Sequence, residues 1–206
     1  METLNFSYKA KSRASFDRQA RQYDISCDGE HARAIYPHVL EKLASFPHQS
    51  VLDIGCGTGE VLSKLAEREG LSLAGLDLSP EMIGMARQKL GDRDDLRAGD
   101  VEELPWPNGS FDVVLCLDSF HHYPRPFDAL AEMWRVISEG GRLILADFWK
   151  PAPMRQLINL FIGFSKDGDV RVYSEPEIRR LLWQSGFEQI RWELVNDSAY
   201  VVTALR

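Results

Sequence analysis

The sequence predicts an α/β fold: a doubly wound, mostly parallel sheet of seven strands that ends in a C-terminal antiparallel hairpin. From Val51 to Phe148, short β-prone apolar segments alternate with segments whose apolar residues recur at helical spacing. Glycines or acidic residues follow the ends of these predicted strands. Residues 187–194 and 199–205 then form two β-prone runs about a turn at Asn196 and Asp197, which predicts the closing hairpin.

Length and composition set the class of protein. The chain has 206 residues, enough for one α/β domain with a full core, and 44% of them are hydrophobic. No run approaches the roughly 18 apolar residues of a membrane span, and the N-terminus lacks the apolar core of a signal peptide, so a cytoplasmic protein is expected. A formal charge of −7 argues against a nucleic-acid partner.

The cysteines carry a second compositional signal. Cys27, Cys56 and Cys116 are scattered and odd in number, which favours reduced thiols over a disulfide framework. No group of cysteines and histidines has zinc-site spacing, so no metal is expected.

Residues 1–50 are predicted to be helical. Phe16, Ala20 and Tyr23 recur at i, i+4 and i+7, so they share one helix face, which either packs on the domain or covers a ligand site. A second helix is expected from His31 to Phe46. Pro37 lies inside that stretch and either kinks the helix or starts it.

The central elements follow in regular order. Ser79 is the expected N-cap of one helix, with Pro80 at its first position. The segment 111–117 is nearly all apolar, as a strand buried on both faces should be, and Gly140 and Gly141 mark a turn. The expected elements are strand 51–55, helix 60–69, strand 71–77, helix 80–90, strand 96–98, strand 111–117, helix 128–137 and strand 142–148.

The final third changes character. A helix is predicted over 154–162, with one strongly apolar face made of Met154, Leu157, Ile158, Phe161 and Ile162. This face lines an apolar pocket, covers the sheet or forms a dimer contact. A polar stretch over 165–172 follows, and Ser174 then caps a helix that runs through Ser185.

The turn after the first strand indicates the kind of ligand. Gly55, Gly57 and Gly59 follow at alternate positions, and they allow a tight bend with close backbone approach. A dinucleotide fingerprint would need glycine at position 60, where Glu60 stands, and no Gly-Lys-Ser/Thr of a phosphate loop follows. Asp53 would repel a phosphate, so it favours a ligand with a cationic end and no phosphate.

Five segments, taken in order, carry a family resemblance. The chain resembles the class I S-adenosylmethionine-dependent methyltransferases, and within them the type-11 group of mostly small-molecule enzymes. The matching segments are Val-Leu-Asp-Ile-Gly-Cys-Gly-Thr-Gly (51–59), Gly-Leu-Asp-Leu-Ser-Pro-Glu-Met-Ile (75–83), Gly-Asp-Val-Glu-Glu-Leu-Pro (99–105), Phe-Asp-Val-Val-Leu-Cys-Leu (111–117) and Gly-Gly-Arg-Leu-Ile-Leu (140–145). The resemblance implies a Rossmann-like methyltransferase fold, a helical lid near Phe16 and S-adenosyl-L-methionine as cofactor.

The resemblance also implies roles for particular residues. Asp77 would accept hydrogen bonds from both ribose hydroxyls, because a carboxylate has two acceptor oxygens. Asp100 would accept from the adenine amine, although it could instead only form a turn, and Met82 could be ordinary core. Asp53 is expected only to fix the turn by bonding backbone amides. The implied cofactor-binding residues are Tyr23, Gly55, Cys56, Gly57, Asp77, Leu78, Met82, Asp100, Val101, Leu117 and His122.

Methyl transfer from a sulfonium is an in-line displacement in which alignment alone supplies much of the catalysis. A base is needed only if the acceptor must lose a proton. The loop from Asp118 to Tyr123 carries the candidates, and His121 is the predicted catalytic residue, with His122 beside the cofactor. The alternative is that both histidines only bond backbone or solvent. Tyr173 is a further possible pocket residue.

These inferences predict a single methyltransferase domain that acts on a small-molecule acceptor, as a monomer or homodimer. Residues 1–50 would form the lid, 51–149 the cofactor-binding core, 150–174 the substrate side and 175–206 the closing helix and hairpin. The amino-directed nucleic-acid methyltransferases carry Asn/Asp-Pro-Pro-Tyr/Phe after the fourth strand, where this chain has Leu117-Asp-Ser-Phe. The alternatives are a non-catalytic cofactor-binding sensor and an enzyme that acts on a protein or RNA partner.

Overall fold

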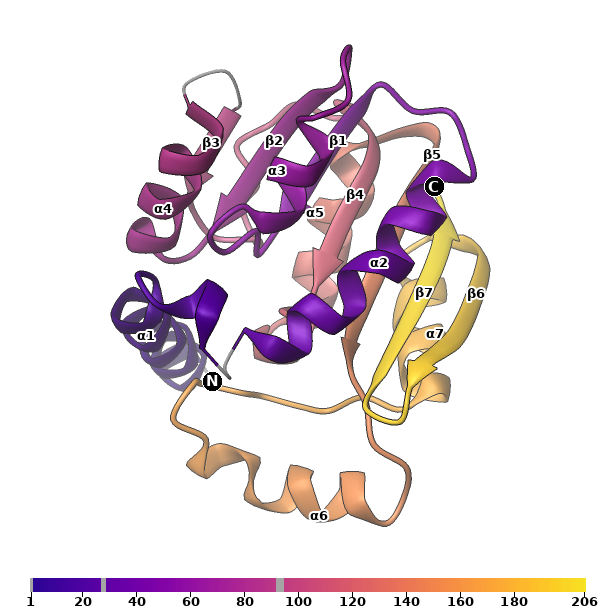
Figure 1. Ribbon diagram of the computed structural model, residues 1–206. Helices are drawn as coiled ribbons and strands as arrows, with labels where there is room; N and C mark the ends of the chain where they lie inside the picture. The colour runs from indigo at the N-terminus through magenta and orange to yellow at the C-terminus, as the bar shows by residue number, and fades with distance from the viewer. Residues whose placement is uncertain (1, 27–28, 92–94) are drawn as a thin grey trace.

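A single seven-stranded sheet organises the molecule (Figure 1). The computed structural model describes residues 2–26, 29–91 and 95–206. The strand order is β3-β2-β1-β4-β5-β7-β6. The strands are β1 (Ser50–Ile54), β2 (Ser72–Asp77), β3 (Asp95–Ala98), β4 (Phe111–Leu117), β5 (Ile137–Phe148), β6 (Glu188–Asn196) and β7 (Ala199–Leu205).

The pairing of the strands confirms the predicted fold class. β1 pairs in parallel with both β2 and β4, so the strand order reverses at this point in the sheet. β7 is antiparallel to both β5 and β6, and it forms the closing hairpin with β6. Ligands on doubly wound sheets bind at the carboxyl ends of the strands where the order reverses. The end of β1 is therefore where a site is expected.

Helices cover both faces of the sheet (Figure 1). Apolar residues of α5 and α7 join one buried cluster, and those of α2, α3 and α4 join the other. The helices are α1 (Glu2–Gln19), α2 (Glu30–Ala44), α3 (Glu60–Leu65), α4 (Pro80–Leu90), α5 (Pro126–Val136), α6 (Met154–Phe161) and α7 (Glu175–Gln184), with short 3₁₀ helices η1 (Tyr23–Ile25), η3 (Phe120–His122) and η4 (Ile162–Phe164).

The N-terminal prediction was wrong in detail. Phe16 and Tyr23 do not share a helix face, because α1 ends at Gln19 and Tyr23 begins η1. The Arg33 guanidinium donates to the carbonyls of Tyr23, Asp24 and Ser26, and these long-range hydrogen bonds hold the chain in a turn. The rings of Phe16 and Tyr23 still meet edge to face, with centroids 6.2 Å apart.

Other boundaries shift because tertiary contacts override local signals. α2 begins at Glu30 and runs through Pro37, so that proline does not start it, and α3 ends at Leu65 rather than at residue 69. β5 begins at Ile137 and includes the two glycines expected to form a turn. A register shift lies beside them, where a Cβ on Gly141 would come 2.8 Å from the Asp112 carbonyl oxygen.

The C-terminal helices confirm the predicted caps but not the packing of α6. Ser174 and Glu177 form a capping box at the start of α7. None of the residues of α6 is buried, and the helix lies beyond the end of the sheet rather than over a face (Figure 1). The alternative that α6 covers the sheet is therefore wrong.

Two sequence expectations concern the cysteines and membrane spans. Cys56 and Cys116 are free and buried, whereas Cys27 lies outside the described residues. Within the described ranges, each helix is too short or too polar to cross a bilayer.

Ser79 gives a test of this fold. Its hydroxyl accepts a hydrogen bond from the Met82 amide at the start of α4 and donates one to Asp17 of α1 at 2.5 Å. We expect Ser79→Ala to lower the free energy of unfolding by about 1–2 kcal/mol, because both the cap and the link to α1 are lost. Urea unfolding followed by circular dichroism measures this value. Ser63→Ala, which removes a single contact with the Glu60 carbonyl, is the matched control, and an equal loss in both variants would contradict the account.

Candidate functional site

A glycine turn joins β1 to α3 and is pinned against the end of β2. The amides of Gly55 and Cys56 both donate to the Leu76 carbonyl, at 2.8 and 3.0 Å. Gly55 and Gly57 have φ angles of +72° and +53°, a region that favours glycine. A Cβ on Gly55 would lie 2.6 Å from the Ser119 side chain, whereas one on Gly57 would stand in open space. The turn therefore presents bare backbone to a cleft.

Asp77 joins this turn to the next helix. Its Oδ2 accepts a hydrogen bond from the Gly57 amide and its Oδ1 one from the Ser79 amide, both at 2.8 Å. Burial raises the pKa of Asp77 to about 6, and the two amides oppose that shift. Each carboxylate oxygen keeps a further lone pair for a ligand hydroxyl.

A cleft with about 860 Å³ of empty space, called the first cavity, lies at the carboxyl ends of β1, β2 and β4. The structure brings together around it all eleven residues that the sequence predicted to bind cofactor: Tyr23, Gly55, Cys56, Gly57, Asp77, Leu78, Met82, Asp100, Val101, Leu117 and His122.

The lid helix α1 closes one side of the first cavity. Lys9 Nζ donates to Asp100 Oδ2 at 2.6 Å and also pairs with Glu102. Asp100 Oδ1 accepts from the Glu102 amide at 3.0 Å, so this carboxylate forms a turn as well as lining the cavity. Sequence reasoning missed Lys9, because the family pattern for the lid starts only at Phe16.

A second cavity adjoins the first. Phe16, Tyr23, Asp118 and His122 line both, while His121 lines only the second. Tyr173 lines neither cavity and packs on Phe120, with ring centroids 5.3 Å apart, so its prediction as a pocket residue was wrong. The remaining residues of the second cavity are Gln19, His31, Phe148, Ile158, Ile162, Asp167, Asp169 and Val172.

His121 is held by Asp147. Its Nδ1 lies 2.5 Å from Asp147 Oδ1, and its amide donates to Oδ2 at 2.9 Å. Burial lowers the pKa of His121, but the Asp147 charge and hydrogen bond outweigh it and raise the pKa to about 10. His121 is therefore an imidazolium near neutral pH and is bound to a carboxylate, which excludes the alternative that it only bonds backbone or solvent.

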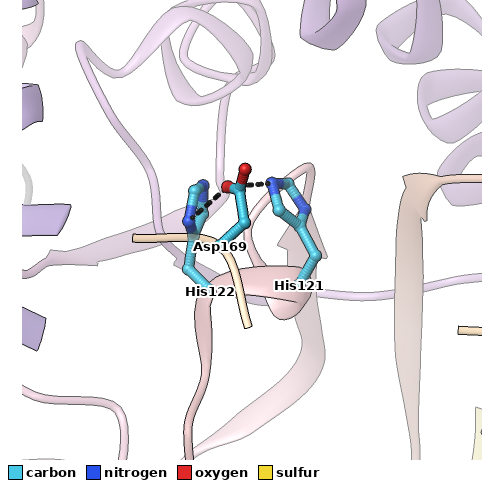
Figure 2. A group of neighbouring side chains, drawn as sticks. All are labelled: His121, His122 and Asp169. Atoms are coloured by element: carbon cyan, nitrogen blue, oxygen red, sulfur yellow. Dashed lines mark ion pairs between the residues drawn. The ribbon is translucent and has the colours of Figure 1, made fainter. Parts of the chain in front are cut away.

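His122, in contrast to His121, is neutral. Its ring packs edge to face on Phe16 at 5.2 Å and lies 4.0 Å from the His121 ring. Burial, followed by the His121 charge, lowers the pKa of His122 to about 3, so this ring is neutral. Its Nδ1 lies 3.1 Å from Asp169 Oδ1, which sequence reasoning did not place here (Figure 2).

A second histidine–carboxylate pair lies at the other end of the same loop. His31 Nδ1 lies 2.8 Å from Asp118 Oδ1, and His31 Nε2 lies 3.0 Å from the Ser198 carbonyl oxygen. Burial lowers the pKa of His31, but the hydrogen bond to Asp118 and the charge of Asp118 outweigh this effect. The net shift of the pKa is therefore upward. This pair ties α2 to the loop after β4, and the residue spacing gave no signal for it.

Asp53 lies beneath the glycine turn and is only 2% exposed. Among the described residues, its Oδ1 has no hydrogen-bond partner, so this oxygen does not fix the turn by bonding amides. Burial and then the Asp77 charge raise the pKa of Asp53 to about 7. An unpaired buried carboxylate oxygen favours a cationic group nearby.

The fold and the two cavities define a methyltransferase of class I type, and comparison with known proteins gives the family. The sequence pattern of the family described as "Methyltransferase domain" matches residues 52–145. An uncharacterized methyltransferase of Geobacillus thermodenitrificans is 32% identical over 205 residues, which cover 93% of this chain and 95% of that protein. The chain therefore belongs to the type-11 group of S-adenosylmethionine-dependent methyltransferases.

Other similar proteins have more specific names. A demethylmenaquinone methyltransferase of Deinococcus radiodurans is 41% identical over 116 residues, which cover 54% of this chain and 48% of that protein. The chain spans between 38% and 62% of the length of this and three other relatives. The Burkholderia thailandensis 1,6-didemethyltoxoflavin-N1-methyltransferase has the same fold, with a TM-score of 0.76 and 23% identity over 98% of this chain and 90% of that one.

Asp53 gives a test that depends on pH. Folding raises the pKa of Asp53 from 3.8 to about 7. Between those two pH values, the folded protein therefore binds a proton that the unfolded chain has released. The wild type therefore loses stability as pH rises from 4 to 7, and Asp53→Asn removes this loss. We expect Asp53→Asn to exceed the wild type in free energy of unfolding by about 2–3 kcal/mol more at pH 8 than at pH 5.

Urea unfolding at the two pH values measures this difference. Asp95→Asn is the contrasting control, because Arg97 lowers the pKa of Asp95 and its removal should cost stability rather than add it. A gain from Asp53→Asn that is the same at pH 5 and pH 8 would contradict the buried charge.

Proposed function

We propose that the protein transfers a methyl group from S-adenosylmethionine, bound in the first cavity, to a small-molecule acceptor bound in the second. The observation that carries this proposal is the contact between the two cavities, which share Phe16, Tyr23, Asp118 and His122. A methyl donor and an acceptor must meet in line, and two adjoining cavities provide that alignment.

The residues of the first cavity fit the cofactor. Gly57 leaves open space where a side chain would stand, so a methionine end can approach the backbone. Asp77 can accept from ribose hydroxyls, and Leu78 and Met82 supply an apolar wall for adenine. The Burkholderia relative in fold is described with bound S-adenosylhomocysteine, which supports the same use of this cleft.

S-Adenosylmethionine, when bound, supplies a methyl group activated by a sulfonium. An electron pair of the acceptor would form the new bond to the methyl carbon, and the carbon–sulfur bond would break toward sulfur. The chain contributes position and exclusion of water. Phe16 of α1 covers both cavities, and the ion pair of Lys9 with Asp100 holds α1 down at 2.6 Å.

His121 remains our candidate catalytic residue, in a role narrower than the general base suggested by the sequence. As an imidazolium it cannot take up a proton, but it can donate a hydrogen bond to an acceptor oxygen and so orient the acceptor. The acceptor proton, where one must leave, passes to solvent.

The acceptor we propose is partly apolar with a polar reacting group. Ile158 of α6 and Ile162 of η4 join Phe148 and Val172 as the apolar part of the lining of the second cavity. The names of the menaquinone-related relatives favour a ring compound of this kind. We place the protein in the cytoplasm as a monomer or homodimer, and the exposed apolar side chains of α6 are compatible with a dimer.

Asp77 tests the cofactor site. Asp77→Asn should weaken S-adenosylmethionine binding roughly 10- to 100-fold, because hydrogen bonds to a charged acceptor are lost. Isothermal titration calorimetry measures the dissociation constant. Asp95→Asn, at an exposed carboxylate on β3, is the control that should bind like the wild type. If wild type and Asp77→Asn bind equally, Asp77 does not hold the ribose.

His121 tests whether turnover depends on the second cavity. We expect His121→Asn to lower kcat roughly 100-fold and to leave the dissociation constant of the cofactor unchanged, because His121 lines only the acceptor cavity. The assay follows formation of S-adenosylhomocysteine with a panel of hydroxylated quinones and phenols.

His38→Asn, at an exposed position on α2, is the control for that assay and should match the wild type. Full activity in His121→Asn would contradict the proposed role. Cofactor binding with no turnover of any acceptor would instead favour the non-catalytic sensor, and a co-purifying protein or RNA would favour a macromolecular acceptor.

A further inference from the structure

We propose that His121, His122 and Asp169 form a binding site for one divalent transition-metal ion at the edge of the second cavity. The Asp169 carboxylate lies between the two imidazole rings (Figure 2). The three donor atoms lie within 4.8 Å of one another. Two imidazoles and one carboxylate are a recurring ligand set for zinc and for non-haem iron.

The distances from Asp169 Oδ1 to the two ring nitrogens leave room for an ion held between the three donors. Asp169 Oδ1 is 3.1 Å from His122 Nδ1 and 3.6 Å from His121 Nε2, and the second distance is too long for a hydrogen bond. Two bonds of about 2.1 Å to donors this far apart enclose angles of roughly 95° and 118°. The first angle lies between the octahedral and tetrahedral values, and the second is somewhat wider than the tetrahedral value.

One donor, His122 Nδ1, faces Asp169 at ion-pair distance but makes no hydrogen bond within the described residues. The His122 side chain is 9% exposed, and this nitrogen is buried. An unsatisfied buried nitrogen is costly, so it calls for a ligand. The Phe16 ring packs edge to face against the His122 imidazole and limits its rotation toward another partner.

A second layer of contacts supports the donors. His121 Nδ1 faces Asp147 at 2.5 Å, which leaves Nε2 directed toward Asp169. An ion bound at Nε2 would take the place of the proton that this nitrogen carries in the metal-free protein. A carboxylate on the far nitrogen of a histidine is the usual support of a metal-binding imidazole. Asp169 Oδ2 accepts from Ser165 Oγ at 2.6 Å, which leaves Oδ1 for the ion.

The loop that carries Asp169 is anchored on both sides. The amides of Val170 and Arg171 donate to the His121 carbonyl at 2.8 and 3.2 Å. Asp167 contacts Ser15 and Gln19 of α1, at 2.5 and 3.1 Å. The three donors are thus held in place by backbone contacts, as a preorganised site requires.

The sequence predicted no metal because its test was the spacing of cysteines and histidines. Asp169 stands far along the chain from His121 and His122, and only the loop packing on η3 joins them. Three protein ligands would leave open positions on the ion, and all three residues line the second cavity. An acceptor with hydroxyl or carbonyl oxygens could bind to the ion at these positions. This consequence rests on the proposed function, whereas binding of the ion does not.

The test is a Co²⁺ titration of the full chain, freed of any purification tag and without cofactor or acceptor. Visible absorption of the bound Co²⁺ reports its stoichiometry and its nitrogen and oxygen ligands. Competition with Zn²⁺ then gives the affinity for zinc. We expect one ion per chain. Asp169→Asn should weaken binding at least tenfold, and Asp147→Asn should weaken it roughly 10- to 100-fold through the supporting contact.

Asp128→Asn is the control, because this carboxylate lies on α5, pairs with Arg125 and lines neither cavity. It should bind Co²⁺ like the wild type. Equal binding in the wild type and Asp169→Asn, or no binding below about millimolar Co²⁺, would overturn the proposal. Either result leaves cofactor binding in the first cavity untouched, so failure of the metal site and of the proposed function can be told apart.

Discussion

Two backbone hydrogen bonds hold the arrangement on which the rest of the site depends. The amides of Gly55 and Cys56 both donate to the carbonyl of Leu76, so the turn after β1 is fixed against the end of β2. A third amide, that of Gly57, then reaches the Asp77 carboxylate. Because β1 has parallel neighbours on both sides, this turn opens at the point where the strand order reverses, and the first cavity forms there.

Charge is distributed unevenly across the two cavities. Beside the first lies the buried Asp53, whose pKa is raised by burial and by the charge of Asp77, and a cationic ligand would relieve that cost of ionisation. In the second, one histidine is charged and its neighbour is neutral, because Asp147 stabilises the proton on His121 alone. The lid helix α1 couples the cavities, because Phe16 contacts both.

Patterns local to the sequence predicted the cofactor side well. Strand periodicity, the glycine spacing and the Ser79 cap gave the sheet, the turn and α4, and these features depend on neighbours in the chain. The features that the sequence did not predict depend on contacts between residues that are not neighbours in the chain. They are the turn that Arg33 holds after α1, the ion pair of Lys9 with Asp100, and the position of Asp169 beside the histidines. The acceptor side is built mainly from contacts of this second kind.

A crystal structure of the protein with S-adenosylhomocysteine would test the central claim most directly. The account predicts density in the first cavity with the ribose hydroxyls on Asp77, the amino-acid end over Gly55 and Gly57, and the sulfur directed toward the second cavity beside His122. Density at another place, or a ligand in the first cavity whose sulfur faces away from the second cavity, would contradict it.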